Sequence, residues 1–334
     1  MRGAVPTLDA GVSQVEPELT RRPVGLLFDG TPLEREVGHL ASVHTADGQS
    51  KLPAWDQRPR RDERRGDELL DLSRPSVSRV YDHWLGGVHN FGVDRDAAAQ
   101  VAALDPLVPC YARANRAFLF RAVSYLLDVG VRQFVDLGCG ISMVGCVHEI
   151  ARRVAPRARV LYVDVDPVAV QLYRQVVAGH PFAAVVRADL RHPETVLRHP
   201  QTRGLIDLSE PVGLLAVGVL HFVPDGDDPA GVLARYRQEL AAGSYLAVSH
   251  ACPPQGPAQR AAADWFAANV AAVRPRSRQE VGQLVAGWEL VAPGLVELTR
   301  WRPDPEGEQV VPPVPGVAAV ARLPGSGRPV AADG

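Results

Sequence analysis

The stretch Phe134-Val-Asp-Leu-Gly-Cys-Gly-Ile141 decides the fold class of this chain. Val135 and Leu137 are spaced as alternate residues of a strand, and Gly138 and Gly140 follow where a strand would turn into a loop. Glycine has no Cβ, so such a loop can adopt backbone angles and approach a ligand in ways that a side chain would prevent. The stretch therefore predicts a strand that leads into a nucleotide-binding loop.

Acidic residues follow the next two strand candidates. The apolar run 158–163 ends in Asp164, and a carboxylate roughly 20 residues beyond a glycine loop binds ribose hydroxyls in a βαβ unit. The run 183–188 ends in Asp189, whose carboxylate could accept a hydrogen bond from an adenine amino group. Aspartate at a strand end can also simply begin a turn. With Asp136 before the glycines, however, the acids together predict a nucleoside site at three strand ends.

The type of cofactor depends on the residues after the glycines. A dinucleotide-binding loop has a third glycine under the pyrophosphate, whereas this chain has Met143 at that position. S-adenosylmethionine (SAM) has no pyrophosphate, and Asp136 would attract its positive ammonium and sulfonium groups. The pattern therefore favours SAM, with S-adenosylhomocysteine as the product. An NAD-dependent oxidoreductase is the disfavoured alternative.

Composition and charge narrow the classes of protein. The 334 residues are 46% hydrophobic and 22% charged, enough to build a full core. A formal net charge of −2 does not provide the basic field that drives nucleic-acid binding. No apolar run reaches the length of a membrane span, and no CxxC pair or convincing metal-ligand set is present. We expect a cytoplasmic protein that binds no nucleic acid, membrane or metal; the sequence does not indicate its oligomeric state.

Three parts of the chain differ in composition. Residues 1–70 are polar and rich in proline, glycine and charge, so we expect a flexible extension. The folded domain is expected over 71–304, with a helical cap or lid at 71–128 and a Rossmann-like core at 129–304. The prolines of 305–334 predict a flexible tail without a regular helix or a central strand.

Strand and helix candidates alternate in the core. The pairs Asp166-Pro167 and Asp228-Pro229 each predict a helix start, with aspartate as N-cap and proline at the first helical position. The segments 289–291 and 295–301 are expected to form a hairpin. This order predicts a doubly wound α/β sheet, mostly parallel, with an antiparallel C-terminal hairpin. Ligands of such sheets bind at the carboxyl ends of the strands.

Several sequence blocks resemble a known family over about residues 73–303. The blocks are Ser78-Arg-Val-Tyr-Asp-His-Trp-Leu-Gly-Gly-Val-His-Asn-Phe91, Ala112-Arg-Ala-Asn-Arg-Ala-Phe-Leu119, Val135-Asp-Leu-Gly-Cys-Gly140, Val147-His-Glu149, Tyr162-Val-Asp-Val-Asp-Pro167, Leu220-His-Phe-Val-Pro-Asp225, Pro293-Gly-Leu295 and Trp301-Arg-Pro303. They resemble the S-adenosyl methyltransferase family of high-GC bacteria, a former domain of unknown function among the class I SAM-dependent methyltransferases. The resemblance implies a seven-stranded Rossmann-like sheet with SAM at the first three strand ends. Family members usually have Gly-Thr-Gly-Leu-Pro-Thr where this chain has Gly138-Cys-Gly-Ile-Ser-Met143, so the contacts of this loop are expected to differ.

Residues ahead of the sheet are candidates for a lid. The block 79–96 combines aromatic side chains with a glycine pair and an amide, a set suited to stacking on adenosine or enclosing an acceptor. The alternative is a helix packed over the sheet, with Gly86-Gly87 a plain turn. Asn115 and Arg116 could bind the methionine carboxylate, although surface solvation of Arg116 is an alternative. The expected cofactor contacts are Asp136, Gly138, Gly140, Asp164, Val165, Asp189, Leu190, Tyr81, Asn90 and Arg116.

A catalytic group is harder to identify. Methyl transfer needs an acceptor lone pair aligned with the sulfonium methyl, and a base only if the acceptor loses a proton. His221 follows the strand candidate 212–217, and His148 and His250 are weaker candidates, because histidine titrates near neutral pH. A lone histidine is more often structural. We expect methylation of a small-molecule acceptor with His221 in contact with it; a SAM-binding sensor or accessory protein without efficient turnover is the alternative.

Overall fold

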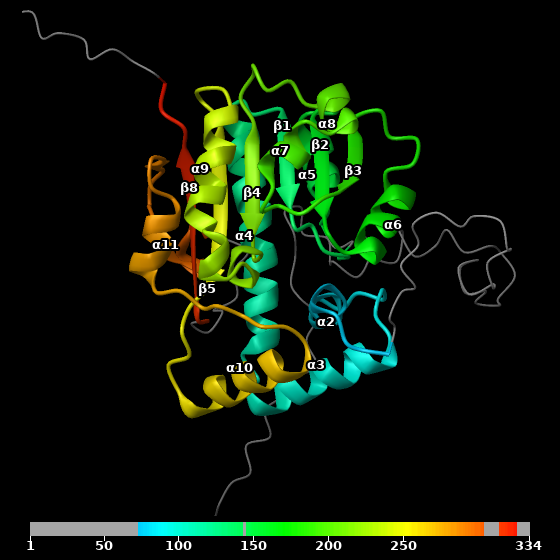
Figure 1. Cartoon of the computed structure of the whole chain (residues 1–334), viewed down its shortest axis with the longest axis vertical. Coiled ribbons are helices and arrows are strands. Elements are labelled where there is room, and N and C mark those ends of the chain that lie inside the picture. The colour runs from blue at the N-terminus through cyan, green and yellow to red at the C-terminus, as the bar shows by residue number, and fades with distance from the viewer. Residues whose placement is uncertain (1–72, 143–144, 304–313, 326–334) are drawn as a thin grey trace, which may run out of the picture. The chain divides into compact units, whose positions relative to one another are not determined.

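The computed structural model describes residues 73–142, 145–303 and 314–325, and the strands among them form one eight-stranded sheet (Figure 1). The strands are β1 (Gln133–Leu137), β2 (Arg159–Asp164), β3 (Ala183–Arg187), β4 (Gly213–Val217), β5 (Tyr245–Ala251), β6 (Glu289–Leu290), β7 (Val296–Glu297) and β8 (Gly316–Arg322). Their order is β3-β2-β1-β4-β5-β8-β6, and β7 also pairs with β8. Strands β1 to β5 are parallel, whereas β8 is antiparallel to β5. The expected doubly wound, mostly parallel sheet is confirmed.

The helices begin where the sequence offers caps. They are α2 (Val77–Trp84), α3 (Gly92–Leu104), α4 (Val108–Asp128), α5 (Val147–Val154), α6 (Pro167–Val176), α7 (Pro193–Leu197), α8 (Pro200–Leu205), α9 (Pro229–Glu239), α10 (Pro257–Asn269) and α11 (Arg278–Leu284). The Asp166 side chain accepts from the N–H of Val168 at the start of α6, and that of Asp228 accepts from Gly231 at the start of α9. Both expected N-caps are therefore confirmed. None of the described helices is long and apolar enough to cross a membrane.

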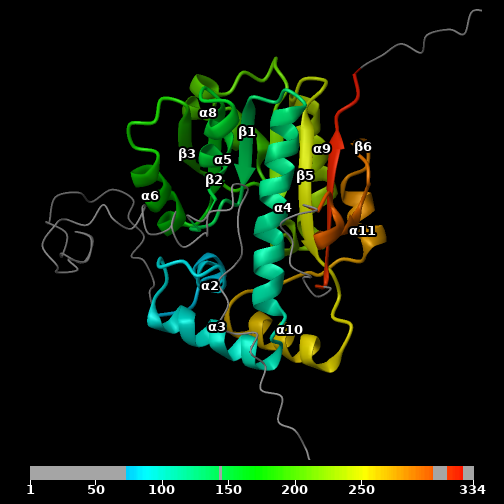
Figure 2. The same ribbon diagram turned by 180° about the vertical axis from the view of Figure 1, so that it is seen from behind.

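Each face of the sheet carries its own apolar layer. Phe134 of β1 packs with Phe118 and Leu126 of α4 on one face, which Figure 2 shows toward the viewer. On the other face, Leu137 of β1 packs with Tyr236 of α9 and its neighbours. These side chains are all fully or almost fully buried. Burial of apolar surface contributes about 25 cal/mol per Å² to the stability of the folded state. The two layers therefore stabilise the sheet and fix the positions of its strand ends.

The C-terminal part of the sheet differs from the expectation. β6 and β7 do not pair with each other as a hairpin; both pair with β8, at opposite ends of that strand, so eight strands fill seven positions. β8 lies in the segment expected to be a tail without a central strand, and that expectation is wrong for residues 316–322. The prolines flank β8 and leave it intact, and its small apolar residues are buried on both faces. Residues 305–313 and 326–334 of the expected tail, and the expected extension 1–70, lie outside the described residues.

Three helices lie beyond the carboxyl ends of the parallel strands (Figure 1). α2 and α3 come from the segment before the sheet and α10 follows β5, and we call these three helices the roof. Val80, Ala97 and Ala98 form a small buried cluster there, with Trp84 and Phe266 packed against it. The expected cap 71–128 therefore supplies two roof helices, while the C-terminal half of α4 belongs to the core.

Candidate functional site

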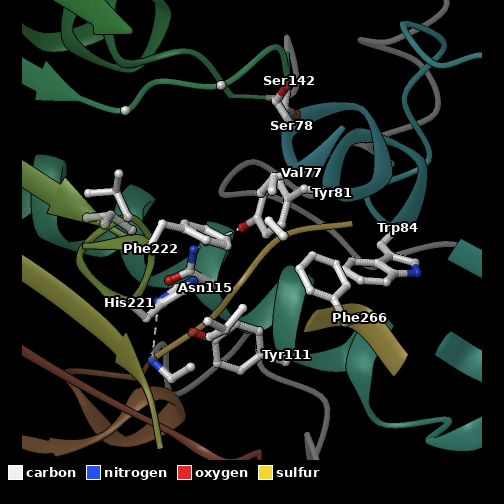
Figure 3. Close-up of a pocket in the computed structure, with 18 of the residues that line it drawn as sticks. Val77, Ser78, Tyr81, Trp84, Tyr111, Asn115, Ser142, His221, Phe222 and Phe266 are labelled. Carbon is white, nitrogen blue, oxygen red and sulfur yellow. Dashed lines mark hydrogen bonds between the residues drawn. The ribbon is translucent and has the colours of Figure 1, made fainter. Parts of the chain in front are cut away.

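A cavity of about 730 Å³ lies between the strand ends and the roof. This is within the range of roughly 300–1,000 Å³ that ligand pockets span. We call the part lined by the carboxyl ends of β1, β2 and β3, with Tyr81 and Arg116, the cofactor end, because the sequence predicts cofactor contacts there. The distal end is the part lined by α3, α10, the segments after β4 and β5, and Trp84 and Tyr111. Figure 3 shows side chains from several of these elements directed into the cavity.

Three carboxylates at strand ends line the cofactor end, as the sequence predicted: Asp136, Asp164 and Asp189. Asp136 is buried, and burial raises its pKa to about 7, against the opposing effect of the Arg116 guanidinium. Burial also raises the pKa of Asp164. Asp189 differs, because hydrogen bonds from the Arg191 guanidinium hold its pKa below the ordinary value. The cofactor end can therefore change its charge near neutral pH at Asp136.

The glycine loop has the backbone that its sequence requires. Gly138 and Gly140 have φ values of +69° and +65°, which side chains rarely adopt. A Cβ on Gly138 would also lie 2.3 Å from Cγ2 of Val219. The two glycines thus allow the chain after β1 to turn sharply against the segment after β4.

Tyr81 and Arg116 join the cavity wall through hydrogen bonds to neighbouring elements. The Tyr81 hydroxyl donates to the carbonyl of Ala112 at 3.0 Å and accepts from Nδ2 of Asn115 at 2.9 Å. Oδ1 of Asn115 in turn accepts from the hydroxyl of Ser249. Arg116 donates from Nη2 to the carbonyl of Ser142 in the glycine loop at 3.0 Å. These bonds tie α2, α4, β5 and the loop together around the cofactor end.

Asn90 is the expected cofactor residue that lies away from the cavity. Its Nδ2 donates to Oδ2 of Asp82 and to the carbonyl of Gly87, so it stabilises the loop after α2. A Cβ on Gly87 would overlap the carboxylate of Asp82, which explains the glycine pair as a turn around this buried acid. The remaining expected cofactor residues all line the cavity: Asp136, Gly138, Gly140, Asp164, Val165, Asp189, Leu190, Tyr81 and Arg116.

The distal end of the cavity is aromatic. Trp84 of α2, Tyr111 of α4, Phe222 after β4 and Phe266 of α10 line it (Figure 3). The Tyr111 hydroxyl is buried and has no hydrogen-bond partner among the residues that the structure describes. The sequence analysis did not identify Tyr111 and Phe266, because neither is adjacent to a strand end. The spacing of apolar residues along α10 was the one signal that could have indicated Phe266.

His221 lies in the cavity wall on a short 3₁₀ turn, Leu220–Phe222. The N–H of Ala251 points to its Nδ1 at 3.5 Å, a long hydrogen bond that favours the neutral tautomer with the proton on Nε2. Burial, with His250 and Arg276 nearby, lowers the pKa of His221 to about 3. The ring is therefore neutral at physiological pH and presents an N–H donor. His148 and His250 do not line the cavity, and burial lowers the pKa of each to about 4.

Comparison with known proteins identifies the family of the chain. The sequence matches the family described as S-adenosyl methyltransferase over residues 63–324, which is well over half of the chain. The chain belongs to this S-adenosyl methyltransferase family. The family resemblance of the sequence blocks is thereby confirmed.

Two solved structures resemble this S-adenosyl methyltransferase over most of its length. One is a protein of the DUF574 family from Streptomyces avermitilis MA-4680, with 36% identity and a TM-score of 0.72, covering 76% of this chain and 99% of that one. The other is a candidate methyltransferase from Thermobifida fusca YX, with 38% identity and a TM-score of 0.71, covering 76% of this chain and 97% of that one. No curated protein sequence matches the chain.

Proposed function

We propose that this protein transfers the methyl group of SAM to a small molecule bound at the distal end of the cavity. The observation that carries the proposal is that one cavity extends from the three strand-end carboxylates to the aromatic space under the roof. A methyl donor and its acceptor must meet in one enclosed space, because the reaction requires the two reacting atoms in line and close together.

The residues at the cofactor end fit the chemical groups of SAM. Asp164 would accept from the ribose hydroxyls, and Asp189 lies at the end where the adenine would bind. Asp136 would favour the ammonium and sulfonium charges, and Arg116 the carboxylate. A buried polar atom also indicates a ligand here: the Ser142 hydroxyl has no hydrogen-bond partner in the described part of the chain.

When bound, SAM would supply the methyl group: a lone pair of the acceptor would form the new bond to the methyl carbon, and the electrons of the broken carbon–sulfur bond would stay on sulfur. An acceptor oxygen or nitrogen that carries a proton would then release it to solvent. The contribution of the protein is to position the acceptor and to exclude water. Tyr81, held by Asn115, closes the cavity from the roof side. His221 would orient the acceptor with its Nε2–H, since a ring with a pKa of about 3 is a poor proton acceptor at neutral pH.

Calorimetric titration with SAM, S-adenosylhomocysteine and NAD in parallel tests the cofactor. We expect the first two to bind with micromolar dissociation constants and NAD not to bind. Binding of NAD alone would refute the proposal. Production of S-adenosylhomocysteine in the presence of mixed phenols and aromatic amines then separates an enzyme from a SAM sensor, for which binding occurs without turnover.

A further inference from the structure

We infer that the acceptor is a planar aromatic molecule with one polar group and no negative charge, an inference that rests on the proposed function. The distal end of the cavity has aromatic walls, offers no cationic side chain to an anionic ligand and places two polar groups in its wall. Each of these features restricts the chemistry of what can bind.

Aromatic rings on different elements line the distal end. Trp84 and Phe266 have ring centroids 6.2 Å apart and planes inclined by 32°, so α2 and α10 present two rings at the roof. Phe222 contributes a further ring from the segment after β4. Flat ligands bind well against such rings, because aromatic pairs stabilise a complex beyond the area they bury.

Charged groups are concentrated at the other end. Arg116 and the carboxylates at the ends of β1 to β3 belong to the cofactor end. Among the described residues that line the distal end, Asp105 is the one with a full charge, and its Oδ1 accepts from the N–H of Leu107 before α4. An anionic ligand would therefore lose its hydration without gaining a cationic partner and would also be repelled by Asp105, which is unfavourable in a buried site.

Two polar groups lie close to the end of β5. His221 receives its hydrogen bond from Ala251, and the ring of Tyr111 lies against Gly316, the β8 residue that pairs with Ala251. Figure 3 shows Tyr111 and His221 in the same part of the cavity wall. The unpartnered Tyr111 hydroxyl and the Nε2–H of His221 can both donate to one oxygen or ring nitrogen. A single polar group on the acceptor would satisfy both.

Calorimetric titration of the full chain saturated with S-adenosylhomocysteine tests this inference. The probes are 1-naphthol, its saturated analogue decahydro-1-naphthol and the anion 1-naphthoate. We expect 1-naphthol to bind about tenfold more tightly than decahydro-1-naphthol, the equivalent of two aromatic contacts. We expect 1-naphthoate also to bind more weakly than 1-naphthol, because its charge gains no cationic partner. Tyr111→Phe should weaken 1-naphthol binding about fivefold, since it removes one hydrogen bond.

Tyr236→Phe is a matched control. The hydroxyl of Tyr236 is also buried and unpartnered among the described residues, but Tyr236 lies in the core away from the cavity, so its variant should bind 1-naphthol like the wild type. If Tyr111→Phe does not fold, Phe266→Leu replaces it and should weaken 1-naphthol severalfold. Binding of S-adenosylhomocysteine with no preference for 1-naphthol, or with a preference for 1-naphthoate, overturns the inference and leaves the methyltransferase proposal intact. Failure of S-adenosylhomocysteine to bind overturns both.

Discussion

The backbone N–H of Gly140 donates a 2.8 Å hydrogen bond to Oδ2 of Asp164. The bond joins the loop after β1 to the end of β2, and the other carboxylate oxygen accepts from the N–H of Asp166 at 2.9 Å. Two backbone donors therefore fix the orientation of this acid. Its remaining lone pairs are the ones available to ribose hydroxyls.

Asp164→Asn should weaken binding of S-adenosylhomocysteine. The amide keeps one acceptor but removes the charge and one of the two oxygens, at a cost of about 1–3 kcal/mol. Calorimetry measures the change. Asp207→Asn is the control, because Asp207 is exposed and bonded to Ser209 far from the cavity. Equal affinities for the two folded variants would remove Asp164 from the cofactor site.

Affinity for SAM should rise with pH around pH 7. Asp136 has a pKa of about 7 against an ordinary value of 3.8, and only its ionised form attracts the cationic cofactor. The ionised fraction increases about tenfold from pH 6 to pH 8, which sets the largest expected gain in affinity. Calorimetry of Asp136→Asn supplies the baseline, since this variant should lack the pH-dependent component. An identical pH profile in the variant would contradict the assignment.

The same pKa shift affects stability with the opposite sign. A folded-state pKa above the unfolded value means that the folded protein holds the proton more tightly. The contribution of Asp136 to the free energy of unfolding is then fully present below about pH 4 and is lost as pH rises through about 7. Chemical denaturation of wild type and Asp136→Asn from pH 5 to 8, in the absence of ligand, should show a loss in the wild type that the variant lacks.

Gly138→Ala should destabilise the protein more than Gly179→Ala. Both glycines have positive φ, +69° and +79°, and this alone costs alanine about 1–2 kcal/mol. Gly179 has open space for a Cβ, whereas the Cβ at position 138 would collide with Val219. The difference in unfolding free energy, measured in denaturant, should be about 1–3 kcal/mol. Equal losses would mean that the loop moves freely away from Val219.

The ring of His221 should not titrate between pH 5 and 8. Burial lowers its pKa to about 3, below the ordinary 6.5, so protonation is disfavoured in the folded state. Its contribution to stability is present above about pH 6.5 and is lost as pH falls toward 3. NMR of ring-labelled histidine, with the His221 signals assigned by their loss in His221→Gln, measures the titration. A midpoint above pH 6 would restore His221 as a candidate base.

Val320→Asp should prevent folding at ordinary temperature. Val320 is fully buried in β8, next to Ala247 of β5, so an aspartate there would bury an unpaired charge. The cost, several kcal/mol, is a large part of the stability of a typical domain. Arg322→Ala, at the exposed end of the same strand, should remain folded by circular dichroism. A soluble, cooperatively folding Val320→Asp protein would contradict the position of β8 in the sheet.

Much of the fold and of the cofactor end could be predicted from the sequence because their signals are local. The glycines after β1, the acids that end β2 and follow β3, and the Asp-Pro caps each combine a residue type with a fixed position in an element. Such features depend on a few neighbouring residues. The order of the parallel strands then brings the acids together at one edge of the sheet.

The distal end could not be predicted in the same way, because it depends on long-range packing. Phe266 reaches Trp84 only when α10 folds back across the segment that precedes the sheet, and no local pattern encodes that contact. At Asn90 the sequence predicted a contact that the structure does not show. An amide beside aromatic residues suggested a ligand contact, but the side chain of Asn90 donates to the buried carboxylate of Asp82 instead. Apart from Arg322 at its exposed end, β8 is apolar and lacks the alternation that marks a half-exposed strand.

The helices that line the cavity differ in how many of their side chains are buried, and this difference indicates which of them tolerates substitution. α4 carries Tyr111 at one end and Phe118 to Leu127 in the core at the other, so any mutation that rotates this helix disturbs both. In α10, by contrast, Ala262 is the one buried residue among Pro257–Asn269. Substitutions along α10 should therefore reshape the distal end of the cavity at the least cost to the stability of the core.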